Sequence, residues 1–187
     1  MKRKFLFGFG FAALIATAPL AMSTPVFAAL QEAGEAIVQR LSQPEVKLVM
    51  SADKQVTVTD ENGQPKLAWE KLEGEATVQP GDVLRYVVAS KNEGDASAEN
   101  LVVTQPITSE MTYVLGSAKG NESAETTYSI DGGETFVAEP MVEVTLPDGT
   151  VELQPAPAEA YTHVKWTFDK TLGASEAVSV SHEVTVN

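Results

Sequence analysis

Residues 163–168 read HVKWTF and residues 178–186 read VSVSHEVTV, and in both stretches apolar and polar side chains alternate. Alternation with a period of two places the two kinds of side chain on opposite faces of an extended chain. Both stretches are therefore predicted to be β-strands with one buried face. Only His182 interrupts the apolar series of the second stretch.

Similar alternation recurs through most of the chain upstream of these two stretches. Turn-forming residues bound each run, which is typical of short strands joined by turns. The acidic segment around Pro155 and Pro157 is predicted to be a link. Strands are predicted at residues 46–50, 56–58, 67–69, 83–91, 101–104, 111–115, 127–130, 134–137 and 141–146.

Two of the predicted turns specify hairpins. Asn62 and Gly63 tolerate the positive φ of a tight turn, so residues 55–72 are predicted to form one hairpin. Residues 131–133 read Asp-Gly-Gly and predict a second hairpin between the strands on either side.

Many short strands with turns about every ten residues predict an all-β protein. The expected fold is an antiparallel immunoglobulin-like β-sandwich with Greek-key connections, formed as a single domain by residues 45–187. A closed barrel would give the same alternation, and the pattern does not distinguish the two.

The first 28 residues have the features of a secretory signal peptide. Three basic residues at 2–4 precede an uncharged run at 5–22, and the small residues Val26 and Ala28 fit a cleavage site after Ala28. The alternative is an uncleaved membrane anchor, because the run approaches the roughly 20 residues that span a bilayer. The prolines near its end and the cleavage site favour removal. The signal peptide predicts an extracytoplasmic location, either periplasmic or secreted to the cell surface. No later apolar run is long enough to cross a membrane, so no membrane insertion is expected after cleavage.

Residues 29–44 are predicted to form a short helical leader. Apolar residues recur at spacings of three and four, which is the stripe of an amphipathic helix. A spacer between the signal peptide and the domain is the alternative interpretation. The stripe consists of Leu30, Ala33, Ile37 and Leu41.

The charge balance of the chain excludes several partners. Cleavage after Ala28 would remove three of the 13 basic residues and none of the 26 acidic ones, leaving a formal charge of −16 over 159 residues. Nucleic acid and anionic lipid both need a basic surface, so neither is expected as a partner. Acidity of this kind favours solubility, and weak calcium binding is the alternative. The chain has no cysteine and therefore no disulfide or thiol chemistry.

The chain lacks recognisable catalytic motifs. Its two histidines, His163 and His182, lie in neither a nucleophile elbow nor a metal-binding helix motif. We expect His163 to be solvated on a polar face, and His182 to be a hydrogen-bonded core residue or a rim residue. Trp69 and Trp166 are expected in the core. No catalytic, cofactor-binding or metal-binding residue is predicted, and no cofactor.

Residues 80–113 carry a series of short motifs: a Pro-Gly-Asp turn, a Tyr-bearing strand, an Asn-x-Gly turn, a valine-rich strand and an aromatic strand. This series resembles the conserved repeat domain of bacterial surface proteins called domain of unknown function eleven. The resemblance implies an immunoglobulin-like extracytoplasmic domain and brings no catalytic residues, although Gln105 and Thr108 replace the family's usual Asp and Pro. The matching residues are Pro80, Gly81, Asp82, Tyr86, Asn92, Gly94, residues 101–104, Tyr113 and the closing strand at residues 176–186.

A smaller resemblance lies in the predicted turn at residues 131–133. The pattern S-x-D-x-G-x-T-F resembles the hairpin called an Asp-box, with Phe in place of Trp. Its aspartate is expected to cap free N–H groups of the turn while the aromatic side chain holds the hairpin together. The residues are Ser129, Asp131, Gly133, Thr135 and Phe136.

Export, the sandwich pattern and the missing catalytic motifs together predict a non-catalytic structural or interaction module of the bacterial cell envelope or surface. Its expected partner is another envelope or surface protein, and its expected binding regions are an exposed sheet face or the loops around Asn92 and Asp131. Two other classes stay open: a small secreted glycan hydrolase that uses carboxylates, and a calcium-assisted adhesion module.

Overall fold

The computed structural model describes residues 43–187 except residues 75 and 122. The predicted signal peptide and nearly all of the predicted helical leader lie outside the described residues. Within them the chain forms ten β-strands and one short 3-10 helix, η1 (Ala158–Ala160). The prediction of an all-β protein is confirmed.

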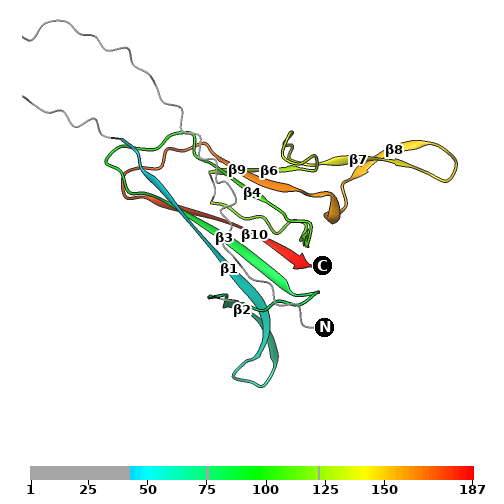
Figure 1. Cartoon of the computed structure of the whole chain (residues 1–187), viewed down its shortest axis with the longest axis horizontal. Helices are drawn as coiled ribbons and strands as arrows, with labels where there is room; N and C mark the ends of the chain where they lie inside the picture. Colours follow the sequence, from blue (N-terminus) through cyan, green and yellow to red (C-terminus); the bar gives the residue numbers. More distant parts are fainter. Residues whose placement is uncertain (1–42, 75, 122) are drawn as a thin grey trace, which may run out of the picture.

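The larger antiparallel sheet has five strands in the order β2-β1-β3-β10-β5 (Figure 1). Its three longest strands pair over most of their length: Met50 of β1 lies opposite Val88 of β3, and Val88 lies opposite Val180 of β10. The bounds are β1 Val46–Thr59, β2 Pro65–Lys71, β3 Val83–Asn92, β5 Met111–Tyr113 and β10 Ala177–Val186.

A second antiparallel sheet has three strands, in the order β4-β9-β6, and faces the larger one (Figure 1). These strands are β4 Val102–Pro106, β6 Ala124–Ser129 and β9 His163–Phe168. The remaining two strands, β7 Met141–Thr145 and β8 Val151–Pro155, form a separate hairpin that projects away from both sheets.

The core lies between the two sheets. Val88 and Val180 of the larger sheet belong to the same buried cluster as Val103, Val164 and Trp166 of the smaller one. The Trp166 side chain is fully buried. Because inward side chains of two separate sheets meet in one core, the architecture is a sandwich, consistent with the predicted immunoglobulin-like fold.

The structure corrects the predicted elements at three places. Residues 46–50 and 56–58 belong to one continuous strand, β1. The predicted strand at 134–137 is reduced to a single bridge between Val137 and Tyr128. The predicted link around Pro155 contains strand β8. The hairpin at residues 55–72 is confirmed, with Asp53 opposite Lys71 and Thr59 opposite Pro65.

The two loops that the sequence suggested as binding regions lie at opposite ends of the sandwich. At one end of β9, His163 lies opposite Ser129, and the Asp131 turn follows. At the other end, the Phe168 N–H donates to the Leu101 carbonyl, and Leu172 pairs with Ala98 in the loop that follows Asn92. A single small-molecule ligand therefore could not contact both loops.

Candidate interaction surfaces

Asn92 ends β3 and is fully buried. Its amide nitrogen donates to the carbonyls of Ala96, Leu172 and Gly173 at 2.7, 3.0 and 3.2 Å. Its carbonyl oxygen accepts from the N–H groups of Glu45 and Gly94, each at 3.1 Å. All of its hydrogen-bonding capacity is used inside the protein, so the side chain is not available to a ligand.

The Asp131 turn is held by the carboxylate of Asp131. One oxygen of this carboxylate accepts from the Ser129 hydroxyl at 2.6 Å and from the backbone N–H of Glu134 at 3.1 Å, and both oxygens accept from the N–H of Thr135. These donors hold the pKa of Asp131 well below its ordinary value of 3.8. The expected capping role of the aspartate agrees with this geometry. Phe136 contributes by packing its ring edge-to-face against His163, with centroids 6.3 Å apart.

Replacing Asp131 with alanine is expected to lower the midpoint of thermal unfolding, because the N–H groups of the turn lose their acceptor. The depressed pKa means that the stabilisation is complete above the ordinary aspartate pKa and is lost as the pH falls below it. The gap between wild type and variant should therefore narrow from pH 5 to pH 2 in thermal melts followed by circular dichroism. The matched control is Asp95→Ala, which removes an exposed carboxylate. A gap that stays constant over this pH range would contradict the prediction.

The two histidines occupy different environments. His163 is half-buried: a Cβ at Gly133 would lie only 3.2 Å from its ring, and its Nδ1 is 3.2 Å from the Thr162 hydroxyl. Burial lowers its pKa, and the charge of Asp131 partly offsets that shift. His182 is a core residue, 2% exposed, and its Nδ1 has no hydrogen-bond partner among the described residues. The expectation of a solvated His163 is therefore wrong in part. His182 lies in the core, which is one of its two expected positions, but its Nδ1 is unpaired among the described residues.

Trp69 is not a core residue, contrary to expectation. It lies half-buried on the outer face of the larger sheet, where the Arg85 guanidinium covers its ring at 4.4 Å from the centroid. Arg85 also donates to the Asp53 carboxylate, with its terminal nitrogen at 2.6 Å. Alternation identified the strand correctly but assigned Trp69 to the wrong face, whereas Trp166 is in the core as expected.

Replacing Arg85 with alanine is expected to lower the free energy of unfolding by about 1–2 kcal/mol, through the lost stacking on Trp69 and an unpaired, largely buried Asp53. Urea titration followed by tryptophan fluorescence measures the change. The matched control is Lys91→Ala on the same strand, whose ion pair with Glu93 at 3.7 Å is exposed and is expected to contribute about 0.5 kcal/mol or less. Equal effects of the two substitutions would contradict the assignment.

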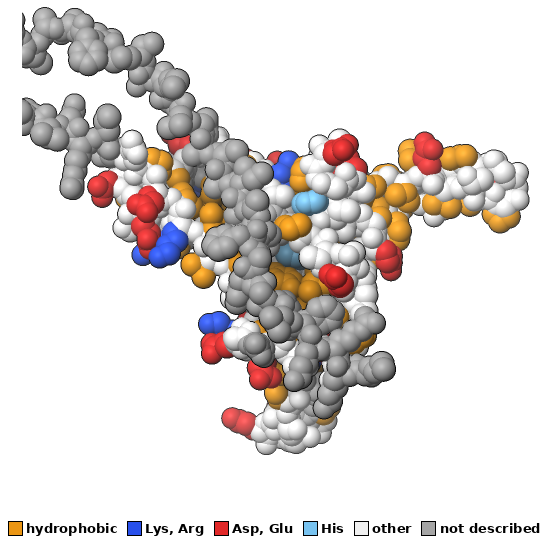
Figure 2. Space-filling model, in the orientation of Figure 1, with side chains coloured by type: hydrophobic (Ala, Val, Ile, Leu, Met, Phe, Trp, Pro, Cys, Tyr) orange, Lys and Arg blue, Asp and Glu red, His pale blue; other side chains and the backbone are white. Residues whose placement is uncertain are grey.

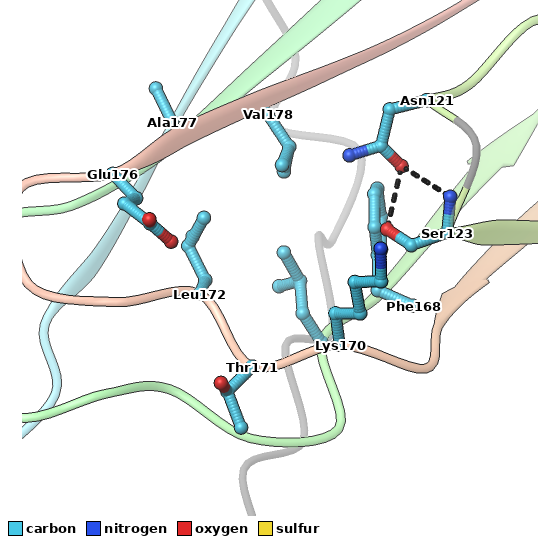
Figure 3. A pocket seen from close by; sticks show the side chains of 10 residues that line it. Asn121, Ser123, Phe168, Lys170, Thr171, Leu172, Glu176, Ala177 and Val178 are labelled. Atoms are coloured by element: carbon cyan, nitrogen blue, oxygen red, sulfur yellow. Dashed lines mark hydrogen bonds between the residues drawn. The ribbon is translucent and has the colours of Figure 1, made fainter.

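A hollow of about 310 Å³ lies beside the start of β10 (Figure 3). Leu101, Phe168, Leu172 and Val178 give it apolar walls, and its polar groups include Lys170. Among the described residues that line it, Glu176 is the only one with a carboxylate, and that carboxylate accepts from the Gly173 N–H at 2.8 Å. Glycoside hydrolysis ordinarily uses two carboxylates about 5–9.5 Å apart, and the described lining residues provide one.

Large apolar side chains are exposed on the projecting β7–β8 hairpin. Met141, Val151 and Leu153 are 43%, 59% and 66% exposed, and Val137 at the base of the hairpin is 48% exposed. Figure 2 shows hydrophobic and acidic side chains on the projecting arm. Sequence reasoning missed this surface because it treated half of the hairpin as a link. One feature of the sequence could have indicated this surface. Residues 120–164 contain no Lys or Arg but include apolar residues.

In residues 43–187, leaving out 75 and 122, no three His, Asp or Glu side chains are grouped so as to hold a metal ion. The same part of the chain contains no helix with the length and hydropathy needed to cross a membrane.

The polar residues of the motifs that suggested a surface-repeat domain are used in the fold itself. Asp82 closes its turn by accepting from the Gln79 N–H at 2.7 Å and pairs with Lys54 at 2.6 Å. Asn92 joins three loops, as described above. The resemblance itself stays a prediction. No protein-family model, curated protein or solved structure matches this chain.

Proposed function

We propose that this chain is an exported, non-catalytic structural or interaction module of the bacterial cell envelope or surface. Export is supported by the basic start, the apolar run and the cleavage site in residues 1–28. The immunoglobulin-like sandwich is an architecture found in many cell-surface domains.

The observation that carries the proposal is the contrast between polar side chains that bond within the fold and apolar side chains that are exposed. Asn92 and Asp131, the polar residues that sequence analysis singled out, hold turns together. Large apolar side chains are instead exposed on a projecting hairpin. Exposed apolar groups gathered on one element are typical of a surface that contacts another protein.

Cell fractionation and N-terminal sequencing test the export step. The expected result is protein in the extracytoplasmic fraction, with Ala29 as its first residue. Protein in the cytoplasm with the leader attached would contradict the proposal. Replacing Ala28 with a bulky residue such as Phe should block cleavage and provides the control, because small residues are required at this position.

Activity and calcium assays separate the alternatives. Release of reducing ends from cell-wall or surface glycans by the purified protein would favour the hydrolase. Heat released on titration with millimolar calcium, and absent with chelator, would favour calcium-assisted adhesion. The proposed module is expected to give neither signal.

A further inference from the structure

The β7–β8 hairpin stands apart from the rest of the fold. Each of its strands pairs only with the other within the described residues, over five pairs from Met141–Pro155 to Thr145–Val151. An isolated two-stranded hairpin is marginally stable in water unless something covers one of its faces or extends its edge. This hairpin therefore has both an apolar face and two strand edges without partners in the described chain.

The backbone hydrogen bonds show which groups are free. Leu146 donates to Thr150, and Pro140 accepts from Ala156, so the even-numbered residues of β7 direct their N–H and C=O groups toward β8. In an antiparallel ladder these directions alternate along the strand. The N–H and C=O groups of Met141, Glu143 and Thr145 therefore point away from β8 and form an open edge.

The two edges of the hairpin are not equivalent. On β8 the outward residues are Val151, Leu153 and Pro155, and proline has no N–H to offer. A proline on an edge strand hinders the addition of another strand. On β7 no proline interrupts the three outward residues. The β7 edge is therefore the better acceptor of an added strand.

The charge of the hairpin selects the kind of partner. Residues 139–159 contain five carboxylates and no Lys or Arg. Like charges placed opposite each other in a sheet are destabilising, so a second copy of this acidic hairpin is a poor partner. A strand with a Lys or Arg opposite Glu143 would instead form a favourable cross-strand pair. The residues are Glu139, Glu143, Asp148, Glu152 and Glu159.

We propose that the β7–β8 hairpin binds an extended segment of a partner protein, rich in β-branched residues and carrying Lys or Arg, which adds as a third strand along the β7 edge. Main-chain hydrogen bonds to Met141, Glu143 and Thr145 supply the binding energy, and alternate side chains supply specificity. Alternate side chains of the added strand lie beside Val142 and Val144 on one face of the hairpin and beside Met141 on the other. The inference deepens the proposed function and rests on it, because it names the partner chemistry of that module.

A peptide-binding assay on the purified chain tests this inference. The probe is a fluorescein-labelled peptide of sequence TVKVTVKVT, followed by fluorescence anisotropy, and the comparison peptide has glutamate at both lysine positions. The lysine peptide is expected to bind at least about tenfold more tightly than the glutamate peptide. No binding at about millimolar peptide, or equal binding of the two peptides, would overturn the inference.

Paired proline variants locate the edge. Thr145→Pro removes an outward N–H from β7, and Val151→Pro removes an outward N–H from β8. Both leave the bonds between β7 and β8 intact. Thr145→Pro is expected to weaken binding of the lysine peptide about tenfold, whereas Val151→Pro leaves it unchanged. The opposite result would overturn the assignment to β7.

A charge-reversal variant keeps the test decisive if a proline disturbs the hairpin. Glu143→Lys is expected to invert the preference, so that the glutamate peptide binds more tightly. An unchanged preference, or a dimer of the chain in sedimentation that Glu143→Lys or Thr145→Pro abolishes, would overturn the inference. The assay uses purified protein, so its failure is distinguishable from a failure of export, which fractionation measures separately.

Discussion

Asn92→Ala is expected to lower the free energy of unfolding by about 3–5 kcal/mol, because it removes five hydrogen bonds and takes the Asn92 partner from the part-buried N–H groups of Glu45 and Gly94 and from the Ala96 carbonyl. The Leu172 and Gly173 carbonyls each keep a second hydrogen bond, from the N–H groups of Ala98 and Glu176. Asn92 forms five hydrogen bonds, all of them to backbone groups. Its partners come from three separate segments: the residues before β1, the turn that follows β3, and the loop before β10. Each buried donor or acceptor left unpaired costs about 1–3 kcal/mol, and some of these groups will be rehydrated.

Urea titration at neutral pH measures this loss. The matched control is Asn62→Ala, which removes an exposed asparagine amide from a hairpin turn and is expected to change the free energy by less than about 0.5 kcal/mol. Asn92→Asp keeps the shape and the acceptor oxygen but directs a carboxylate at three carbonyl oxygens. It should therefore be as destabilising as the alanine variant. A stable Asn92→Asp would contradict the assignment of the amide nitrogen as donor.

The neighbouring Gly94 belongs to the same arrangement. A Cβ at this position would overlap the Gln43 carbonyl oxygen and lie 2.9 Å from the backbone carbon of Pro44. The two residues of the Asn-x-Gly turn therefore act together. Gly94 leaves room for the backbone of residues 43–45, and Asn92 accepts a hydrogen bond from that segment. The sequence marks both residues as turn formers, but their role depends on Leu172 and Gly173, about 80 positions away. Local pattern carries no information about such distant partners.

Alternation predicted the strands best where one face is buried along the whole strand. β9 and β10 are examples, because every inward residue of β9 is in the core. The middle of β1 was missed because residues 51–55 read SADKQ, with no alternation. Its backbone is nevertheless paired throughout, residues 51–54 with β3 and residues 53–55 with β2, and its charges are matched by Asp82 and Arg85. Tertiary pairing thus extends the strand through residues that would not form one alone.

Alternation also does not show which face of a predicted strand is buried. Leu67 and Trp69 alternate correctly but lie on the outer side of β2, which among the described strands is an edge strand paired with β1. Strand β8 was missed for a related reason. It is short, exposed and ends at Pro155, so its sequence has no buried face that would produce alternation of apolar and polar residues. The candidate docking surface lies on that same hairpin. A period of two identifies a strand, whereas the position of the strand in the sheet decides which face is buried.

Acidification from pH 7 to pH 4 is expected to destabilise the fold by about 3 kcal/mol through His182 alone. Burial lowers the pKa of His182 from 6.5 to about 4. The ring stacks on Tyr86 with centroids 5.7 Å apart, and the rings of Trp166 and Tyr113 lie at 5.9 and 6.5 Å. These neighbours provide no negative charge that would stabilise an imidazolium ion.

The sign follows from proton uptake. Between pH 6.5 and pH 4 the unfolded chain binds a proton at His182 that the folded chain does not, so unfolding becomes more favourable as the pH falls. The expected loss is about 2 kcal/mol at pH 5 and about 3 kcal/mol at pH 4. Carboxylates with depressed pKa values, such as Asp131, add their own losses only below about pH 4.

Comparison with His182→Leu isolates this contribution. Leucine keeps the position apolar and cannot titrate, so its free energy of unfolding is expected to change little between pH 7 and pH 5, while that of the wild type falls. His163→Gln is the control: its parent histidine is only half-buried, so most of the wild-type slope should remain. Parallel pH profiles for wild type and His182→Leu would mean that His182 is protonated within the fold. The buried ring would then need a hydrogen-bond acceptor at Nδ1, where the described residues provide none.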